Sequence, residues 1–331
     1  MAKEQALPSR KSQTPSVGYY ASKYGIIIAF FVICIAITIA EPRFLSVNNL
    51  FNVLRQTSVN GILAIGMTFV ILTRGIDLSV GSVLAFAGVV AASVAQVPIQ
   101  GEPMPWYLAV LAGMAAGAAL GLVNGVLVAR FAVPAFVATL GMLSTARGMT
   151  FIYADGQPIS RLDPQFLELG RGLVMGIPVP IILFAIVFAL AWFTLNRSTF
   201  GRHVYAVGGN ERAAITSGIS AWKVKLAVYV ISGLCAGIAG VILTARTTAG
   251  LPQAGVTYEL DAIAAVVIGG TSLAGGVGTV MGTLFGALII GVINNGLDLL
   301  GVSSYYQQVI KGIIIVGAVL LDMSRRAREA A

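Results

Sequence analysis

The amino-acid sequence predicts an all-α membrane protein of about ten transmembrane helices with an inverted internal repeat. Only 10% of its residues are charged and 57% are hydrophobic, whereas a water-soluble domain carries about 25% charged residues. Apolar runs that approach the roughly 20 residues needed to cross a bilayer recur along the chain. We expect ten spans, at residues 25–40, 59–73, 78–97, 106–129, 133–153, 177–195, 224–244, 262–274, 279–297 and 307–321. The shortest runs suggest tilted, broken or re-entrant helices, which are tolerated where protein covers them.

Other classes of protein are excluded by what the sequence contains. The net charge is +8, but the basic residues are spread over many short connections without a nucleic-acid-binding motif. Cys34 and Cys235 fall inside apolar runs, where they are expected to be small core residues and neither disulfide partners nor metal ligands. No phosphate-binding Gly-x-x-x-x-Gly-Lys loop and no zinc-ligand spacing occurs. Covalent chemistry and a resident metal are therefore not expected.

The ends of the chain are polar and the middle is apolar. Residues 1–23 are expected to be a disordered tail, residues 24–322 the membrane domain, and residues 323–331 a short basic tail. The first apolar run resembles a cleaved signal peptide in length. We expect it to be retained as the first span, because the predicted topology fits the charge distribution best with it included. With the N-terminus in the cytoplasm, most lysines and arginines outside the spans fall on the inner side, as the positive-inside rule requires. Both termini are then cytoplasmic.

Two echoes at nearly the same offset indicate an internal repeat. Residues 70–73 recur at 241–244, and the glycine pattern of residues 113–125 recurs at 282–296. Spans 2–5 would match spans 7–10, and a shift of five spans makes the two halves cross the membrane in opposite directions, a common transporter plan. Chance in a glycine-rich sequence is the alternative. The Gly-x-x-x-Gly spacing is expected mainly to bring helix backbones close together.

Polar side chains inside the spans have two interpretations each. Arg147 and Lys311 either line an aqueous cavity, or snorkel to the outer interface or cap neighbouring carbonyls. Asn124, Asn294 and Asn295 either meet a hydroxylated solute or tie helices together by hydrogen bonds.

Carboxylates are expected at or beyond the ends of the spans. Asp77 and Asp298 lie at span ends, and Glu259 and Asp261 fall in an outer loop. Asp77 is expected to cap free N–H groups at the start of a helix. Because no carboxylate or histidine lies in mid-span, proton coupling is disfavoured; sodium coupling through backbone carbonyls stays open.

The largest inner loop, residues 196–223, is expected to hold one short helix. Gly208 and Gly209 interrupt the chain, Asn210 is a good N-cap and Glu211 occupies the first turn. Gly218 is a natural terminator. A helix of about seven residues is marginal alone in water, so it needs a docking partner or packs on its own bundle. The small side chains of Ala213 and Ala214 favour close approach by another surface.

Residues 201–219 resemble the coupling loop of ABC-importer permeases. The pattern Glu211-Arg212-Ala213-Ala214…Gly218 is a variant of theirs, with Arg212 inserted. The segments ILTRGIDLSVGS (71–82), YELDAIAAVVIGGTSLAGGVGTVMGTLFGALIIGVINNGL (258–297) and LLGVSSYYQQVIKG (299–312) resemble the ribose-type permease of bacterial sugar importers. The resemblance runs from about residue 44 to 322. One departure is Val277, where the family leads us to expect a basic residue.

The resemblance implies a type II ABC-importer-like fold and a set of partners. Two copies of the chain, ten helices each, would surround a central pathway in the bacterial inner membrane. Two cytoplasmic ATPase modules, which hold the ATP and Mg, would dock on the helices at 208–220, and a periplasmic sugar-binding protein would deliver a small sugar. This chain itself would carry no cofactor and would not be an enzyme.

The substrate implied by the resemblance is ribose, with xylose, galactose or autoinducer-2 as alternatives. A stand-alone sodium-coupled transporter with the same repeat is the second hypothesis. A channel fits poorly, because no charged or carbonyl-rich filter is visible.

Overall fold

The computed structural model describes residues 17–98 and 103–330, almost all of which form a bundle of helices. Each of the ten predicted spans overlaps one longer helix. These are α1 (Val17–Ala40), α2 (Val47–Leu72), α3 (Val80–Ala95), α4 (Trp106–Ala129), α5 (Ala135–Tyr153), α7 (Val179–Arg197), α10 (Ala221–Thr247), α11 (Tyr258–Ile268), α12 (Val280–Leu299) and α13 (Ser304–Ala330). Within the described residues, α4, α5, α7, α10 and α12 are long and apolar enough to cross a membrane.

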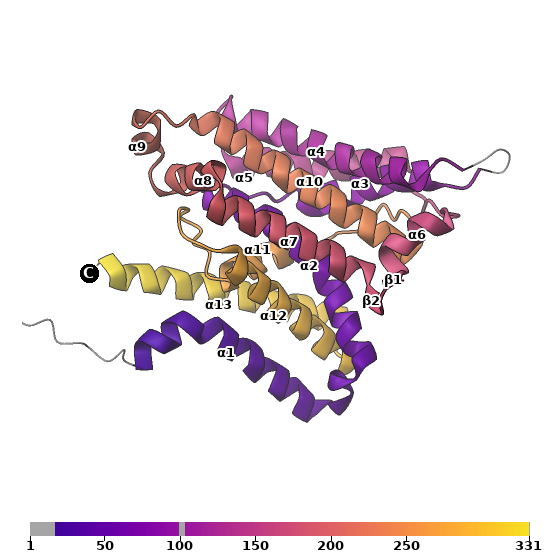
Figure 1. The fold of residues 1–331 in the computed structure, drawn as a ribbon, viewed down its shortest axis with the longest axis horizontal. Coiled ribbons are helices and arrows are strands. Elements are labelled where there is room, and N and C mark those ends of the chain that lie inside the picture. The colour runs from indigo at the N-terminus through magenta and orange to yellow at the C-terminus, as the bar shows by residue number, and fades with distance from the viewer. Residues whose placement is uncertain (1–16, 99–102, 331) are drawn as a thin grey trace, which may run out of the picture.

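The other helices and the two strands lie at the ends of the bundle. At one end are α8 (Thr199–Gly209) and α9 (Glu211–Thr216), and the beginning of α1 and the end of α13 lie at that same end, on the left of Figure 1. At the opposite end lie α6 (Pro164–Arg171) and a two-stranded hairpin of β1 (Leu173–Val174) and β2 (Ile177–Pro178). A single 3₁₀ turn, η1 (Pro42–Leu45), joins α1 to α2.

The helices at the chain ends extend beyond the predicted spans. α1 begins at Val17, so residues 17–23 of the predicted tail are helical, while residues 1–16 lie outside the described residues. α13 continues to Ala330 and takes in residues 323–330 of the predicted basic tail; residue 331 lies outside the described residues. The backbone hydrogen bonds of these two helices therefore run on past the apolar segments.

The core of the bundle lies around α2 and α10. From Thr57 to Leu72 every residue of α2 is buried, and α10 packs against α2, α3 and α4. α1 lies at the edge of the bundle, where it packs against α12. Because lipid tails are as apolar as the helices, van der Waals contact and not the exclusion of water holds such a bundle together.

Glycines allow the closest helix contacts, as the Gly-x-x-x-Gly spacing predicts. A Cβ added at Gly117 of α4 would lie 2.3 Å from the Gly233 carbonyl oxygen of α10, and a Cβ at Gly233 would lie 2.3 Å from the Gly117 oxygen. A Cβ at Gly282 of α12 would lie 2.0 Å from the Gly269 oxygen at the end of α11. These helices touch backbone to backbone, so glycine is required at each contact.

The packing reproduces the predicted repeat. Exchanging α2 with α10, α3 with α11, α4 with α12 and α5 with α13 turns one set of helix contacts into another that is also present. The contact of α4 with α10 becomes that of α12 with α2, α3 with α4 becomes α11 with α12, and α3 with α5 becomes α11 with α13. The contact of α4 with α5 is an exception, because α12 and α13 have no contact of similar extent. The other contacts give the two halves equivalent neighbours.

Candidate functional site

The predicted short helix forms, with the predicted caps. The Asn210 side chain accepts a hydrogen bond from the Ala213 N–H at 3.0 Å, and α9 starts at Glu211. At the other end the Gly218 N–H bonds the Ile215 carbonyl at 2.9 Å, and Gly218 has a φ of +83°. An L side chain in this left-handed conformation would cost roughly 1–2 kcal/mol, which explains the glycine.

The expectation that Gly208 and Gly209 interrupt the chain is corrected. They are the last two residues of a helix that was not predicted, α8. Ser198 caps the beginning of α8 by accepting a hydrogen bond from the Gly201 N–H at 3.0 Å. Only Asn210 separates α8 from α9, and it has extended backbone angles. The inner loop is therefore a pair of helices joined by a single residue.

An ion pair attaches α9 to the bundle. Lys225 Nζ, in the second turn of α10, lies 2.7 and 2.8 Å from the two carboxylate oxygens of Glu211. Ala214 is buried, while Arg212 and Ala213 are exposed on the outer face of α9. One face of the helix therefore packs on its own chain and the other faces outward.

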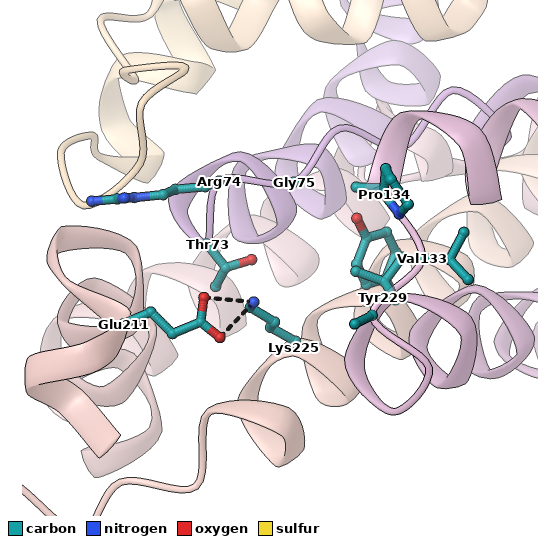
Figure 2. A pocket seen from close by; sticks show the side chains of 11 residues that line it. Thr73, Arg74, Gly75, Val133, Pro134, Glu211, Lys225 and Tyr229 are labelled. Atoms are coloured by element: carbon teal, nitrogen blue, oxygen red, sulfur yellow. Dashed lines mark hydrogen bonds and ion pairs between the residues drawn. The ribbon is translucent and has the colours of Figure 1, made fainter. Parts of the chain in front are cut away.

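A cavity of about 240 Å³ lies beside this ion pair. Figure 2 shows Glu211 and Lys225 meeting in front of Thr73, with Tyr229 and Pro134 on the other side. The cavity separates α9 from the turn between α4 and α5 that also lines it. Polar groups line one wall and apolar side chains the other.

Two further side chains at this end escaped the sequence analysis. Arg74, just beyond α2, donates from Nε to the Gly208 carbonyl at 2.6 Å and from Nη2 to the Gly209 carbonyl. The Tyr205 hydroxyl of α8 donates to the Gly278 carbonyl at 2.8 Å, and burial raises the pKa of Tyr205. Because all three acceptors are backbone carbonyls distant in sequence, no residue pattern could have revealed these contacts.

Asp77 plays a wider part than the predicted cap. Its Oδ1 accepts hydrogen bonds from the Ser79 N–H at 3.0 Å and from the Ser79 hydroxyl at 2.6 Å. Its Oδ2 accepts one from the Ser232 hydroxyl of α10 at 2.8 Å. Asp77 lies between the end of α2 and the start of α3, as expected for a span end. Its side chain is nevertheless fully buried, because the residue is only 1% exposed. The carboxylate joins the start of α3 to α10.

Asn124 and Asn295 form hydrogen bonds to residues outside their own helices, as the helix-tying interpretation describes. Asn124 of α4 is buried and donates to the Ser79 hydroxyl at 2.9 Å. Asn295 of α12 and Asn49 of α2 exchange two amide hydrogen bonds of 2.9 Å each. Asn294, also buried in α12, has its amide beside Asp261.

The two basic residues inside the spans have protein partners. Arg147 Nη1 donates to the carbonyls of Pro252 and Ala254 at 2.8 and 2.7 Å, as its carbonyl-capping interpretation describes. Lys311 Nζ donates to Asp261 Oδ2 at 2.9 Å. The outer-loop placement of Asp261 is therefore corrected: it lies in the first turn of α11 and is 3% exposed. Sequence spacing gave no signal for this pair, because the partners lie on different helices.

No metal centre forms among the residues that the structure describes. No group of three or more histidine, cysteine, aspartate or glutamate side chains converges there. The polar groups described above instead bond to one another and to backbone carbonyls.

Comparison with known proteins points to one family. The chain is 50% identical to the ribose import permease protein RbsC of Escherichia coli (strain K12), over 91% of this chain and 93% of that relative. It is 49% identical to the ribose import permease protein of Bacillus subtilis (strain 168), over 92% and 94% of the two chains. It is 41% identical to the D-allose transport system permease protein of Escherichia coli (strain K12), over 91% of each. No solved structure matches the chain with significance. A family described as "Branched-chain amino acid transport system / permease component" matches residues 49–319. The chain is accordingly a membrane subunit of a transporter and not an enzyme. It belongs to this permease family.

Proposed function

We propose that this chain is the membrane subunit of an ATP-driven importer of ribose. The observation that supports ribose as the substrate is that sequence identity is higher to ribose permeases than to permeases for other sugars. Ribose permeases from three species are 49–50% identical to this chain, whereas a D-allose permease is 41% identical and an L-arabinose permease 38% identical.

The outer face of α9 supports docking of a separate ATPase module. α9 has a cap at each end and an ion pair that holds it to α10. Its outward face presents Arg212, Ala213 and Ile215, of which Ile215 is 55% exposed. This exposed face, on a helix fixed to the bundle at its other side, is available for contact with another protein. ATP and Mg would be bound by that partner.

Two copies of this chain would complete the pathway, and a periplasmic sugar-binding protein would engage the end opposite α9. In support, α5 and α13 hold equivalent places in the two halves and leave one face exposed along much of their length. The end that carries α9 also carries the beginning of α1 and the end of α13, which agrees with both termini on the cytoplasmic side of the inner membrane.

Uptake by the reconstituted importer tests this function. The chain is co-expressed with its ATPase, reconstituted into vesicles and supplied with its binding protein and labelled ribose. We expect uptake that requires ATP and is inhibited less by allose and arabinose than by unlabelled ribose. Uptake driven by a sodium gradient without ATP would contradict the proposal.

A surface variant tests the docking face. Ile215→Asp places a charge on the exposed face of α9, and we expect loss of the ATPase from the purified complex. The control is Phe131→Asp, which changes an apolar side chain that is 68% exposed in the turn after α4 and leaves α9 intact. Retention of the ATPase by Ile215→Asp would place the docking surface elsewhere.

A further inference from the structure

Three segments that are distant in sequence meet where α8 contacts the rest of the bundle. They are the C-terminal end of α2 (72–74), the second half of α8 (205–209) and the turn between α11 and α12 (275–278). α2 belongs to the first half of the inverted repeat, and the α11–α12 turn belongs to the second. We call this meeting point the three-way junction.

Arg74 joins the first segment to the second. Its planar guanidinium donates from two nitrogens to the carbonyls of Gly208 and Gly209, which are the last two residues of α8. A cation at this position satisfies free carbonyls and meets the negative end of the helix dipole. Arg74 also has a φ of +66°, a conformation that persists only where the surroundings hold it.

The backbone joins the first segment to the third. The Gly276 N–H donates to the Leu72 carbonyl at 2.9 Å. A Cβ at Gly208 would lie 1.7 Å from that same Leu72 oxygen, and a Cβ at Gly276 would lie 2.8 Å from the Gly209 Cα. The three backbones are therefore in direct contact, and no side chain fits between them.

Tyr205 joins the second segment to the third. Its hydroxyl donates to the Gly278 carbonyl at 2.8 Å, one residue before the Thr279 N-cap of α12. A displacement of α8 consequently acts on the start of α12 as well as on the end of α2. Independently, the ion pair from Glu211 to Lys225 connects α9 to α10.

We propose that Arg74 and Tyr205 are positioning residues that transmit displacement of the α8–α9 pair to both halves of the inverted repeat at once. The proposal rests on the function proposed above, in which an ATPase moves α9. Both residues act through carbonyls of the protein's own backbone. Their contacts make the end of α2 and the start of α12 follow α8 together, so the two halves change conformation in step.

The test uses the complete importer in vesicles, with Arg74→Gln and Tyr205→Phe made separately. Three quantities are measured: the ATPase retained on purification, the rate of ATP hydrolysis and the rate of ribose uptake. We expect the ATPase to stay bound and hydrolysis to continue, while uptake falls at least about tenfold, equivalent to about 1.4 kcal/mol. The ATP hydrolysed per sugar transported then rises, which a merely destabilised protein would not produce.

Two further variants sharpen the result. Arg74→Lys keeps the charge but not the forked donor geometry, so its ATP consumed per sugar should fall between that of the parent protein and that of Arg74→Gln. Arg130→Gln removes an exposed charge just beyond α4 and should leave the ratio unchanged. If Arg74→Gln fails to fold, Tyr205→Phe, which removes one hydroxyl, still decides the question.

The opposing outcomes are distinct. An unchanged ATP-to-sugar ratio in both variants would overturn the proposal, whether uptake is normal or falls in proportion to hydrolysis. Loss of the ATPase from both variants would show that the junction only shapes the docking surface, which also overturns it. Failure of the parent protein to take up ribose with ATP would instead refute the proposed function.

Discussion

Asp261 of α11 and Lys311 of α13 form an ion pair of 2.9 Å inside the helix bundle, with side chains 3% and 19% exposed. Asn60 of α2 lies at 3.5 Å from the same carboxylate oxygen. The pair therefore links two helices of the second half of the repeat, and α2 approaches it from the first half. The main contribution of such a buried pair to protein stability is that each charge compensates the other, because a single buried charge would be strongly destabilising.

Removing one partner of this pair should destabilise the protein more than removing both. Lys311→Met leaves the Asp261 carboxylate buried without its cation, and breaking such a pair costs about 3–5 kcal/mol. The double variant Asp261→Asn with Lys311→Met leaves no uncompensated charge and should recover most of that loss. Thermal unfolding in detergent measures the difference. The control, Lys223→Met, changes an exposed lysine and should leave the midpoint within the error; equal losses in the single and double variants would contradict the prediction.

The reciprocal amide pair between Asn49 and Asn295 should show a modest coupling energy. Interhelical hydrogen bonds in membrane proteins are worth about 0.6 kcal/mol on average and reach about 1.7 kcal/mol. Because this pair contains two such bonds, we expect coupling of about 1–2 kcal/mol in a double-mutant cycle with Asn49→Ala and Asn295→Ala. The free energy of unfolding of the four proteins gives the value. Additive losses would mean that the two amides do not depend on each other.

Alanine at two helical glycines should have opposite effects. Ala is a better helix former than Gly by roughly 1 kcal/mol, so Gly141→Ala, where nothing lies within 4 Å of the added Cβ, should keep or raise stability. Gly117→Ala places the Cβ 2.3 Å from the Gly233 oxygen and should lower stability by about 1–3 kcal/mol through overpacking. Matched thermal unfolding curves compare the two. A stabilised Gly117→Ala would show that α4 and α10 separate easily.

The Ser232 hydroxyl should matter because its acceptor is a buried carboxylate. Ser232→Ala removes one of the three hydrogen bonds that Asp77 accepts, and hydrogen bonds to charged groups contribute about 1.5–3 kcal/mol. We expect a loss of that size in the free energy of unfolding. Ser144→Ala, at an exposed position of α5, is the matched control. A Ser232→Ala protein as stable as the control would mean that Asp77 does not need this donor.

Patterns within one segment were enough to predict the spans and α9. Apolar runs located the ten helices that overlap the predicted spans. The Asn210 and Gly218 caps defined α9 to within one residue, because capping depends on neighbours in sequence. The repeat was visible as two echoes because the glycines of α4 and of α12 both allow a neighbouring helix to approach closely, although the neighbours differ.

Contacts between distant segments could not be predicted in this way. The partners of Arg74 and Tyr205 are carbonyls, which every residue possesses, so the sequence carries no mark of them. Asp261 was misplaced because α11 begins at Tyr258, before the apolar run that starts at Ala262, and its partner is on another helix. α8 was missed because its buried apolar side chains, Val204 and Val207, are too few to stand out beside the spans.

The backbone contact between α4 and α10 limits where the molecule can move. With glycines of each helix seated against carbonyls of the other, sliding or rotation would drive neighbouring side chains into the opposing backbone. These two helices consequently behave as one stiff plate, to which the buried Asp77 fastens α3. Any hinge that opens the protein alternately to its two sides is therefore expected outside the contact between α4 and α10.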